Sequence, residues 1–202
     1  MSTTKADSAS YSDTSNPPSK KRSTFVKILL GIAALLAILA VVIATRPSDY
    51  SVTRSATFAA PPATVFAQVN DFHAWEAWSP WAKLDPNAKT TFEGPTSGEG
   101  AKFSWDGDNN VGAGSMTILE SKPDERIRIQ LDFVRPFAGT SDTLFTFKPE
   151  GDQTNVTWTM SGKNNFIAKA IGLIIDCDKI IGGNFEQGLA SMKTIVESPS
   201  KQ

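Results

Sequence analysis

The chain has 202 residues, which is enough for one ordinary domain with an appendage but too few for two domains of usual size. Hydrophobic residues make up 40% of it and charged residues 20%, the composition of a globular protein. The formal net charge is −1, and acidic residues outnumber Lys and Arg after residue 46. The body therefore lacks the basic surface that a nucleic-acid partner requires.

The first 24 residues, "MSTTKADSASYSDTSNPPSKKRST", are rich in Ser and Thr and hold few apolar side chains that could build a core. Such a composition is typical of a disordered segment. Lys20, Lys21, Arg22 and Lys27 precede the apolar run that follows, whereas only Arg46 follows it closely. Basic residues collect on the cytoplasmic side of a membrane span, so residues 1–24 are predicted to form a cytoplasmic tail.

From Ile28 to Thr45 the sequence "ILLGIAALLAILAVVIAT" carries no charge. As a helix this run is roughly 27 Å long, close to the hydrocarbon thickness of a bilayer. It exceeds the apolar region of an ordinary signal peptide, and its small-residue cleavage pattern is poor. We therefore predict a retained transmembrane signal anchor over residues 25–46 in the inner (plasma) membrane. The following domain would then lie on the extracytoplasmic side, and a cleaved signal peptide is the alternative.

The body, residues 47–198, begins with a predicted strand at 50–58 and a helix within 59–72 that starts at two prolines. A short helix follows over residues 73–81 and is stopped by Pro80. From Phe166 to about Glu197 the apolar period becomes helical, and Gly182 and Gly183 are expected to bend this long helix. Between these helices, alternating apolar residues bounded by turn-forming clusters predict six strands: 89–94, 101–107, 114–123, 126–136, 142–151 and 154–162.

This order of elements predicts an α+β fold in which a curved antiparallel sheet covers its apolar face with the last helix. Alternation along the strands places a set of large apolar side chains on that inner face. A concave apolar gap between sheet and helix is the default place for a small molecule. The inward candidates are Phe103, Trp105, Phe133, Phe145, Phe147, Trp158 and Met160.

Three stretches of the body together resemble a known family. They are "VTRSATFAAPPATVFAQVNDFHAWEAWSPW", "GEGAKFSWDGDNNVGAGSMTILES" and "NVTWTMSGKNNF…IGGNFEQGLASMK". These stretches are similar to the polyketide cyclase/dehydrase branch of the START-like (SRPBCC) superfamily, and in particular to bacterial members with an N-terminal membrane anchor. The resemblance covers nearly all of 47–197. It implies a helix-grip fold with a hydrophobic cavity for lipids, polyketides or other apolar molecules. It implies no reaction and transfers no catalytic residue.

Three of the five tryptophans, Trp75, Trp78 and Trp81, fall within seven positions. As core residues, Trp75 and Trp78 would pack one helical face against the sheet. As ligand-binding residues, all three would border the mouth of the cavity. Packing is the simpler interpretation, and the two interpretations overlap because residues at a mouth also pack.

Two charged residues are candidates for a polar contact in the groove. Asp176 lies in an apolar helical run, so its carboxylate either faces solvent or needs a partner. Arg54 is in register with apolar strand residues, and if it points inward it needs an anion from the protein or from a ligand. A bulge that turns Arg54 outward is the alternative.

The remaining reactive side chains suggest no catalytic or metal site. His73, the only histidine, has no evident Ser or Cys partner, and Cys177 lies in an apolar stretch where it is expected to be a small buried hydrophobe. A single cysteine excludes an internal disulfide and a Cys-based zinc site. The acids are scattered, so we expect neither a metal nor a cofactor.

These observations predict a membrane-anchored protein that binds a hydrophobic or amphipathic small molecule, such as a lipid or a polyketide. The first alternative is a cyclase- or dehydratase-like enzyme that uses the same cavity, with Asp176 or Arg54 as its ionisable group. The second is an interaction module with a filled core and no ligand.

Overall fold

The computed structural model describes residues 20–198 and divides into two units, which meet between Thr45 and Arg46. Within the first unit, helix α1 (Lys20–Thr45) includes 22 residues, Thr24–Thr45, that are long and apolar enough to cross a membrane. This helix is compatible with either a signal anchor or a signal peptide. It begins at Lys20, whereas residues 1–19 of the predicted tail lie outside the described part of the chain.

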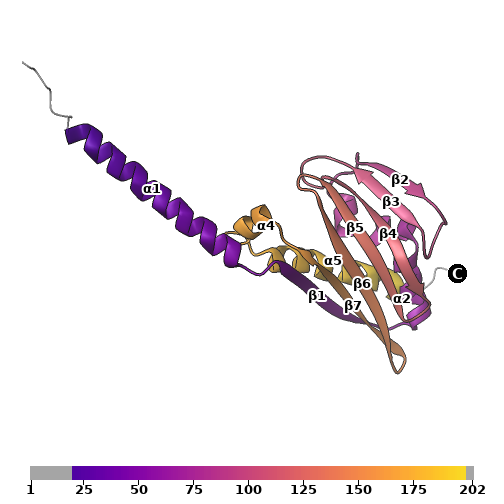
Figure 1. Cartoon of the computed structure of the whole chain (residues 1–202). Coiled ribbons are helices and arrows are strands. Elements are labelled where there is room, and N and C mark those ends of the chain that lie inside the picture. Colours follow the sequence, from indigo (N-terminus) through magenta and orange to yellow (C-terminus); the bar gives the residue numbers. More distant parts are fainter. Residues whose placement is uncertain (1–19, 199–202) are drawn as a thin grey trace, which may run out of the picture. The chain divides into compact units, whose positions relative to one another are not determined.

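The second unit is a single α+β domain (Figure 1). Its helical elements before the sheet are α2 (Pro62–Asn70), the 3-10 turn η1 (Phe72–Ala74), α3 (Trp75–Trp78) and the 3-10 turn η2 (Pro80–Lys83). Its strands are β1 (Asp49–Phe58), β2 (Lys89–Glu93), β3 (Lys102–Asp106), β4 (Ala113–Lys122), β5 (Arg126–Arg135), β6 (Gly139–Glu150) and β7 (Gln153–Lys163). Two helices end the domain, α4 (Phe166–Ile171) and α5 (Cys177–Glu197).

All seven strands form one antiparallel sheet in the order β1-β7-β6-β5-β4-β3-β2 (Figure 1). The first strand is an edge strand that pairs with the last, from Asp49 opposite Lys163 to Phe58 opposite Thr154. The remaining strands follow one another as a meander, as expected when strands are joined by short turns. The sheet is curved and packs on the long helix α5, which confirms the predicted helix-grip fold.

Side chains of α5 hold it along β1. Arg54 on β1 is paired with two carboxylates of α5, and further along Lys193 Nζ donates to the carbonyl of Thr57 at 2.8 Å. At its end, Glu197 Oε1 accepts from the backbone N–H of Ala59 at 2.6 Å. The helix therefore runs from the middle of β1 toward Ala59, and away from the residues at which β1 begins.

The core lies between the inner face of the sheet and the helices. Three residues of α2, Val65, Phe66 and Val69, and three of α5, Phe185, Leu189 and Met192, are buried against it. The spacing of each set places it on one face of its helix. The strands contribute alternating buried residues, as period-two patterning requires: Val52, Phe58, Ile118, Ile127, Ile129, Phe145, Phe147, Val156, Trp158 and Met160.

The C-terminal helix differs from the prediction. Instead of one helix from Phe166 with a bend at the two glycines, the chain forms α4, leaves helical geometry after Gly172, and starts α5 at Cys177. Asp176 caps the new helix, with Oδ1 accepting from the N–H of Lys179 at 3.1 Å. Gly182 and Gly183 lie within uninterrupted helix. The predicted short helix at 73–81 is likewise divided into η1, α3 and η2, because Pro80 cannot continue α3.

Candidate ligand-binding site

One half of the space between sheet and helix is filled by stacked aromatic rings. Trp158 of β7 lies parallel to Phe185 of α5, with ring centroids 4.0 Å apart, and is 4.7 Å from Phe145 of β6. All three side chains are almost fully buried. Gly188 of α5 lets this stack form, since a Cβ there would lie 3.1 Å from Cζ3 of Trp158. We call this region, with Phe147 and Ile129, the packed half of the grip.

The tryptophans of residues 75–81 belong mainly to the packed half. Trp75 and Trp78 are buried, and their indole N–H groups donate to the carbonyls of Val69 and Gln68 at 3.0 and 3.1 Å. Trp78 lies edge-on to Trp158 at 5.7 Å. The two side chains therefore pack between α2 and the sheet. Trp81 is only partly buried, and its ring lies 6.3 Å from that of Phe185.

A second row of side chains crosses the whole sheet beyond the start of α5. Backbone register places these residues side by side: Tyr50, Gly162, Ser141, Leu131, Met116, Phe103 and Phe92. Asp178, in the first turn of α5, already lies at Arg54, so the helix does not extend over this row. Most of its apolar side chains remain partly exposed, and we call the row together with Trp105 and Phe133 the open half of the grip.

Aromatic contacts organise the open half from within the sheet. Trp105 lies edge-on to Phe133 at 6.1 Å, and its indole N–H donates to the carbonyl of Val111 at 3.0 Å. Gly114, opposite Trp105 on β4, is needed for this placement, because a Cβ would lie 2.6 Å from the indole ring. Phe103 bridges toward the helical side, with its ring 6.2 Å from that of Phe72. These rings are therefore fixed in place although they are not sealed from solvent.

A few polar groups lie among these apolar side chains. The hydroxyl groups of Tyr50 and Ser141 are 2.7 Å apart, and Thr143 is buried on the neighbouring position of β6. Trp158 Nε1 is buried and has no hydrogen-bond partner among the described residues. Most buried donors in proteins are paired, so this N–H is an exception that an acceptor atom would satisfy. An apolar wall with a few polar groups is the usual character of a small-molecule site.

Arg54 points toward the helix, and the protein itself supplies the anion that it needs. Its Nε lies 2.7 Å from Glu186 Oε1 and its Nη2 lies 3.0 Å from Asp178 Oδ2. The hydrogen bonds from Arg54 lower the pKa of Asp178, and those to Asp178 and Glu186 raise the pKa of Arg54. Arg54 therefore joins β1 to α5. Asp176, the other charged candidate, caps α5.

His73 and Cys177 are not arranged for nucleophilic catalysis. The His73 ring stacks on Phe92 at 4.0 Å, and its Nδ1 lies 2.7 Å from Asp71 Oδ1. Cys177 is exposed, not buried as expected. Within residues 20–198, no group of three or more His, Cys, Asp or Glu side chains is placed to hold a metal ion.

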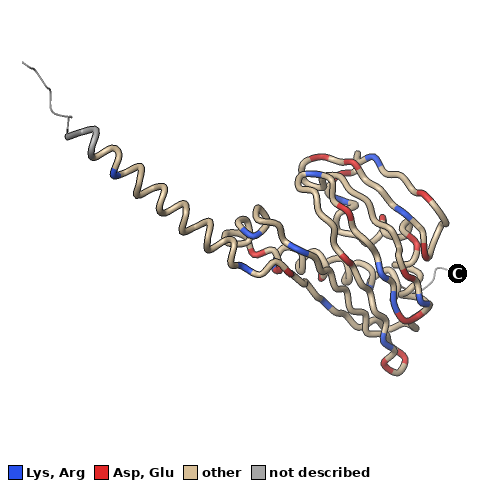
Figure 2. Tube along the Cα trace, in the orientation of Figure 1, with Lys and Arg blue, Asp and Glu red and all other residues tan. Residues whose placement is uncertain are grey.

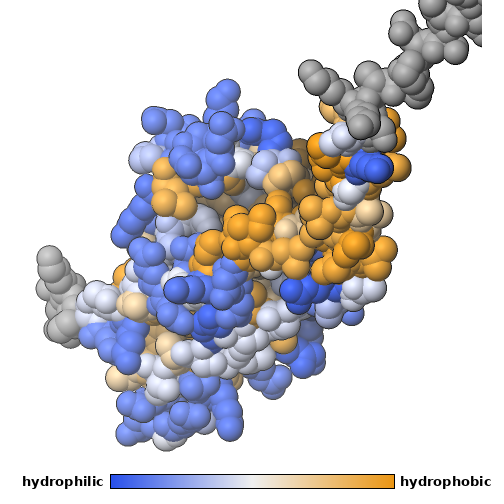
Figure 3. Space-filling view, turned by 90° about the vertical axis from the view of Figure 1, so that its left-hand side faces the viewer, coloured by the Kyte–Doolittle hydropathy of each residue, from blue (hydrophilic) through white to orange (hydrophobic). Residues whose placement is uncertain are grey.

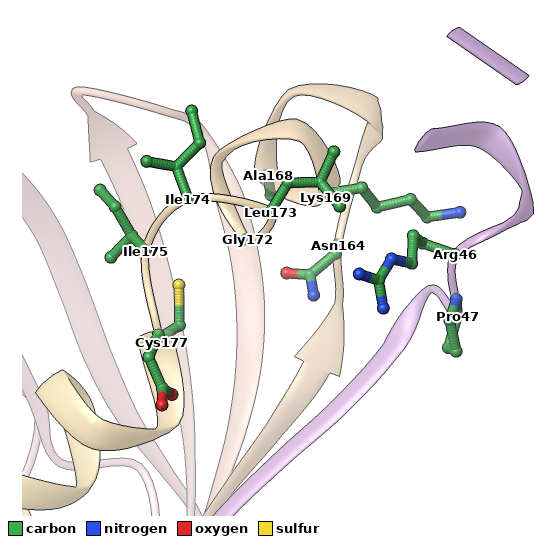
Figure 4. A pocket seen from close by; sticks show the side chains of 11 residues that line it. Arg46, Pro47, Asn164, Ala168, Lys169, Gly172, Leu173, Ile174, Ile175 and Cys177 are labelled. Atoms are coloured by element: carbon green, nitrogen blue, oxygen red, sulfur yellow. The ribbon is translucent and has the colours of Figure 1, made fainter. Parts of the chain in front are cut away.

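Two hollows among the described residues are open to solvent, and neither is enclosed between the sheet and α5, although Tyr50, Ser141 and Gly162 of the open half border one of them. One, of about 530 Å³, is lined mostly by polar residues of β1 and β5–β7. The other, of about 490 Å³, lies at α4 and the turn before α5 (Figure 4). Apolar side chains of Leu173, Ile174 and Ile175 line it together with the cations of Arg46 and Lys169. Elsewhere acidic and basic residues alternate along the domain, without a continuous basic stripe (Figure 2).

The structure thus separates the predicted site residues into two groups. Trp75, Trp78, Phe145, Phe147 and Trp158 are in the packed half, whereas Phe103, Trp105 and Phe133 are in the open half. Trp81 is partly buried at the edge of the packed half, against Trp158 and Phe185. Met160 is buried between them, on the row that joins Val52 and Thr143.

Sequence reasoning missed the pair Tyr50–Ser141 and the hollow at α4. Alternation along 50–58 could have pointed to Tyr50, and the apolar run "LIIDCDKII" could have pointed to the hollow.

Comparison with known proteins shows the same architecture elsewhere. The model of a family described as "Polyketide cyclase / dehydrase and lipid transport" matches residues 49–197. Among curated proteins, none matches the chain. Many solved structures do, at low sequence identity, which supports the fold alone.

Three of these structures illustrate the likeness. Protein CV1439 from Chromobacterium violaceum is 18% identical, with a TM-score of 0.55 over 74% of this chain and 98% of its own. Protein MLL2253 from Mesorhizobium loti is 16% identical, with a TM-score of 0.55 over 73% and 97%. The Aha1 dimer from Colwellia psychrerythraea is 15% identical, with a TM-score of 0.54 over 73% and 96%.

Proposed function

The chain belongs to the polyketide cyclase/dehydrase and lipid transport family, and from this premise we propose that it binds a hydrophobic or amphipathic small molecule in the open half of the grip. In this proposal α1 is a retained anchor that keeps the binding domain at the extracytoplasmic surface of the plasma membrane. A lipid-like molecule is the class of ligand that such an anchored apolar site would meet most often.

One observation carries the binding proposal. Ile127, Ile129, Leu131 and Phe133 occupy the same face of β5, yet the first two are fully buried and the last two are partly exposed. The first pair belongs to the buried core together with the apolar face of α2, which packs on β5, whereas the last pair lies outside the fully buried core. Partly exposed apolar side chains that are held by ring contacts present apolar area to a ligand at little cost in conformational entropy.

The polar groups at the border of the two halves suit an amphipathic ligand. An apolar chain would lie on Leu131, Met116 and Phe133, while the hydroxyl groups of Tyr50 and Ser141 would meet a polar head. The geometry gives less support to an enzyme, since its two candidate groups are engaged: Arg54 in two ion pairs and Asp176 in a helix cap.

Binding can be tested with residues 46–202, which form a unit of their own. The probe is cis-parinaric acid, a fluorescent fatty acid whose uptake quenches nearby tryptophans such as Trp81 and Trp105. Leu131→Ala removes apolar contact in the open half and is expected to weaken binding about fivefold or more, because it removes about three methylene equivalents of contact area. Ile129→Val, on the same face in the packed half, is the matched control and should leave the affinity unchanged.

Native mass spectrometry of the full chain, extracted gently from its host membrane, gives the natural ligand. A bound small molecule would define the ligand class by its mass. No uptake of parinaric acid and no bound molecule would contradict the proposal and would favour an interaction module whose apolar face is covered by another protein.

A further inference from the structure

The segment that follows β7 and contains α4 and the start of α5 carries several large, exposed apolar side chains. We call residues 164–180 the α4–α5 corner. Ile174 is 88% exposed, and four more large apolar side chains of the corner are each at least 44% exposed: Phe166, Ile167, Ile175 and Ile180. In the space-filling view of Figure 3, hydrophilic residues cover most of the visible surface, and apolar residues are gathered in one part of it. A concentration of this kind marks a surface that is covered by something apolar.

The backbone fixes the corner beside the first residues of the domain. The N–H of Asn164 donates to the carbonyl of Ser48 at 2.7 Å, directly beyond the pair Asp49 and Lys163. Arg46 and Pro47 line the same hollow as Ala168, Lys169 and Ile174. Whatever the orientation of the domain, three peptide units separate Ser48 from Thr45, so the chain keeps them within about 11 Å. The corner is therefore tethered closely to the end of the apolar helix.

The charges of the hollow suit one class of partner. Two cations, Arg46 and Lys169, line the hollow, and neither forms an ion pair with another described residue. The carboxylate of Asp176 lines the hollow as well, but it accepts a hydrogen bond from the N–H of Lys179. Its apolar wall is made by Leu173, Ile174 and Ile175. Cations above an apolar surface match the phosphate groups and acyl chains of a phospholipid leaflet.

We propose that the α4–α5 corner docks on an anionic phospholipid bilayer, with Ile174 and Ile175 below the head groups and with Arg46 and Lys169 at the phosphates. The inference rests on the proposed function, because it requires that α1 remain in the membrane. It adds a route for the ligand. The row that begins with Tyr50 and Gly162 lies next to the corner along β1 and β7, so docking brings the open half of the grip to the bilayer surface.

The test uses the full chain in nanodiscs that contain phosphatidylglycerol and phosphatidylcholine, with one protein per disc. Cys177 is the only cysteine, is exposed and lines the hollow, so the unaltered protein can carry a single environment-sensitive fluorophore there. Lipids with a nitroxide group near the head are expected to quench this fluorophore strongly. The matched control carries the fluorophore at Asp152→Cys in a Cys177→Ser background, at the turn that precedes β7, and should be quenched little.

Substitutions separate the two parts of the interaction. Ile174→Asp with Ile175→Asp should abolish the quenching at Cys177. Arg46→Gln and Lys169→Gln should each lower the docked fraction about fivefold in anionic discs, and neither should matter in discs of phosphatidylcholine alone. All four residues are exposed or lie at the rim of the hollow, and circular dichroism will verify that each variant folds.

Two results would overturn the docking proposal. One is equal quenching at residues 177 and 152, and the other is quenching at Cys177 only when a disc holds two copies, which would indicate self-association. Uptake of parinaric acid by residues 46–202 is measured separately. Uptake without lipid quenching would reject the docking surface alone, and lipid quenching without uptake would reject the ligand site alone.

Discussion

At the scale of single residues, Arg54 has the most consequential position in the domain. Its guanidinium reaches from an edge strand to two carboxylates of α5, at Asp178 and Glu186, and also donates to the carbonyl of Thr53 at 2.8 Å. The carboxylates are largely exposed, so each ion pair is weak by itself. Gly182 of α5 makes room for the Arg54 side chain here, because a Cβ at this position would overlap the guanidinium group.

Two adjacent glycines of α5 allow a direct test of this close approach. A Cβ at Gly183 would meet nothing within 4 Å, whereas a Cβ at Gly182 would overlap the Arg54 guanidinium. Alanine is the better helix former by about 1 kcal/mol, so Gly183→Ala should raise the free energy of unfolding by about that amount. Gly182→Ala should lose that gain by displacing Arg54. Urea denaturation measures the free energy of unfolding of both variants. In an Arg54→Ala background, Gly182→Ala should again raise the free energy of unfolding. Equal gains at both positions would be inconsistent with the close approach.

The same ion pair predicts how stability depends on pH. Because the hydrogen bond from Arg54 lowers the pKa of Asp178 in the folded state, the unfolded chain binds a proton there at a higher pH. This contribution is complete above the unfolded pKa of about 3.9 and is lost as pH falls through the lower folded value. Arg54→Met should therefore flatten the loss of stability below about pH 4. Urea denaturation midpoints measured from neutral to acidic pH give this pH dependence of stability. Lys148→Met is the control, and it should show the same dependence on pH as the wild type.

Single residues show where sequence reasoning stops. Alternation along β1 left two orientations open for Arg54, and it could not say that, with the side chain inward, the protein itself supplies the anion. Asp178 and Glu186 lie more than 120 positions away, and only the position of α5 brings them near. Asp176 was noticed for its charge, yet its side chain serves the backbone of the helix that follows.

At the scale of elements, the interruption between α4 and α5 fixes where the long helix begins on β1. Because α5 starts at Cys177, its first turn lies at Arg54 and not at Tyr50. The chain leaves helical geometry at Gly172 and starts again with a cap at Asp176. The exposed isoleucines Ile174 and Ile175 lie at this break, and the Tyr50 end of the open half lies beyond the first turn of α5.

The cap can be weakened without disturbing the rest of the core. Asp176→Ala removes the acceptor for the Lys179 N–H and should lower the free energy of unfolding by about 1 kcal/mol. Asp176→Asn keeps an oxygen that can accept and should restore most of the loss. Thermal and urea unfolding of both variants distinguish a cap from a surface charge, since a charge effect would not be restored by the neutral side chain.

Elements also show how much of the fold the sequence could predict. Period-two alternation located the strands, because most of them have one buried and one solvated face. The exception is β2, which is exposed along its whole length. The helical break was missed because apolar residues continue through "AIGLIIDCDKII" at helical spacing, and only Gly172 and Asp176 signal the change. The rows that define the open half depend on strand register, and β4 shifts register twice, between Ala113 and Gly114 and between Ile118 and Glu120. Such shifts leave no clear mark in a sequence.

At the scale of the whole molecule, the proposed function needs α1 to be retained. The full chain should then stay in the membrane after alkaline carbonate extraction, and its mass should remain 21.7 kDa. Residues 46–202 expressed alone should be released. In spheroplasts, a membrane-impermeant maleimide should label Cys177 from outside, since basic residues before the span favour an internal N-terminus. A shorter chain that begins near residue 46 would instead identify a cleaved signal peptide.

The place of β1 in the sheet has a consequence for how the protein is made. The hydroxyl group of Thr53 on β1 forms a hydrogen bond with that of Thr159 on β7, 106 positions later. The helix that packs on β1 is α5, the last in the chain. During translation β1 is synthesised long before β7 and α5. Contacts between residues so far apart in the sequence form slowly. Until β7 and α5 have been synthesised, the backbone N–H and C=O groups of β1 have no partner strand. They can then pair with an exposed strand of another chain. The segment from β7 to α5, residues 153–197, therefore determines when the domain closes, and protection of the nascent chain matters most before this segment emerges.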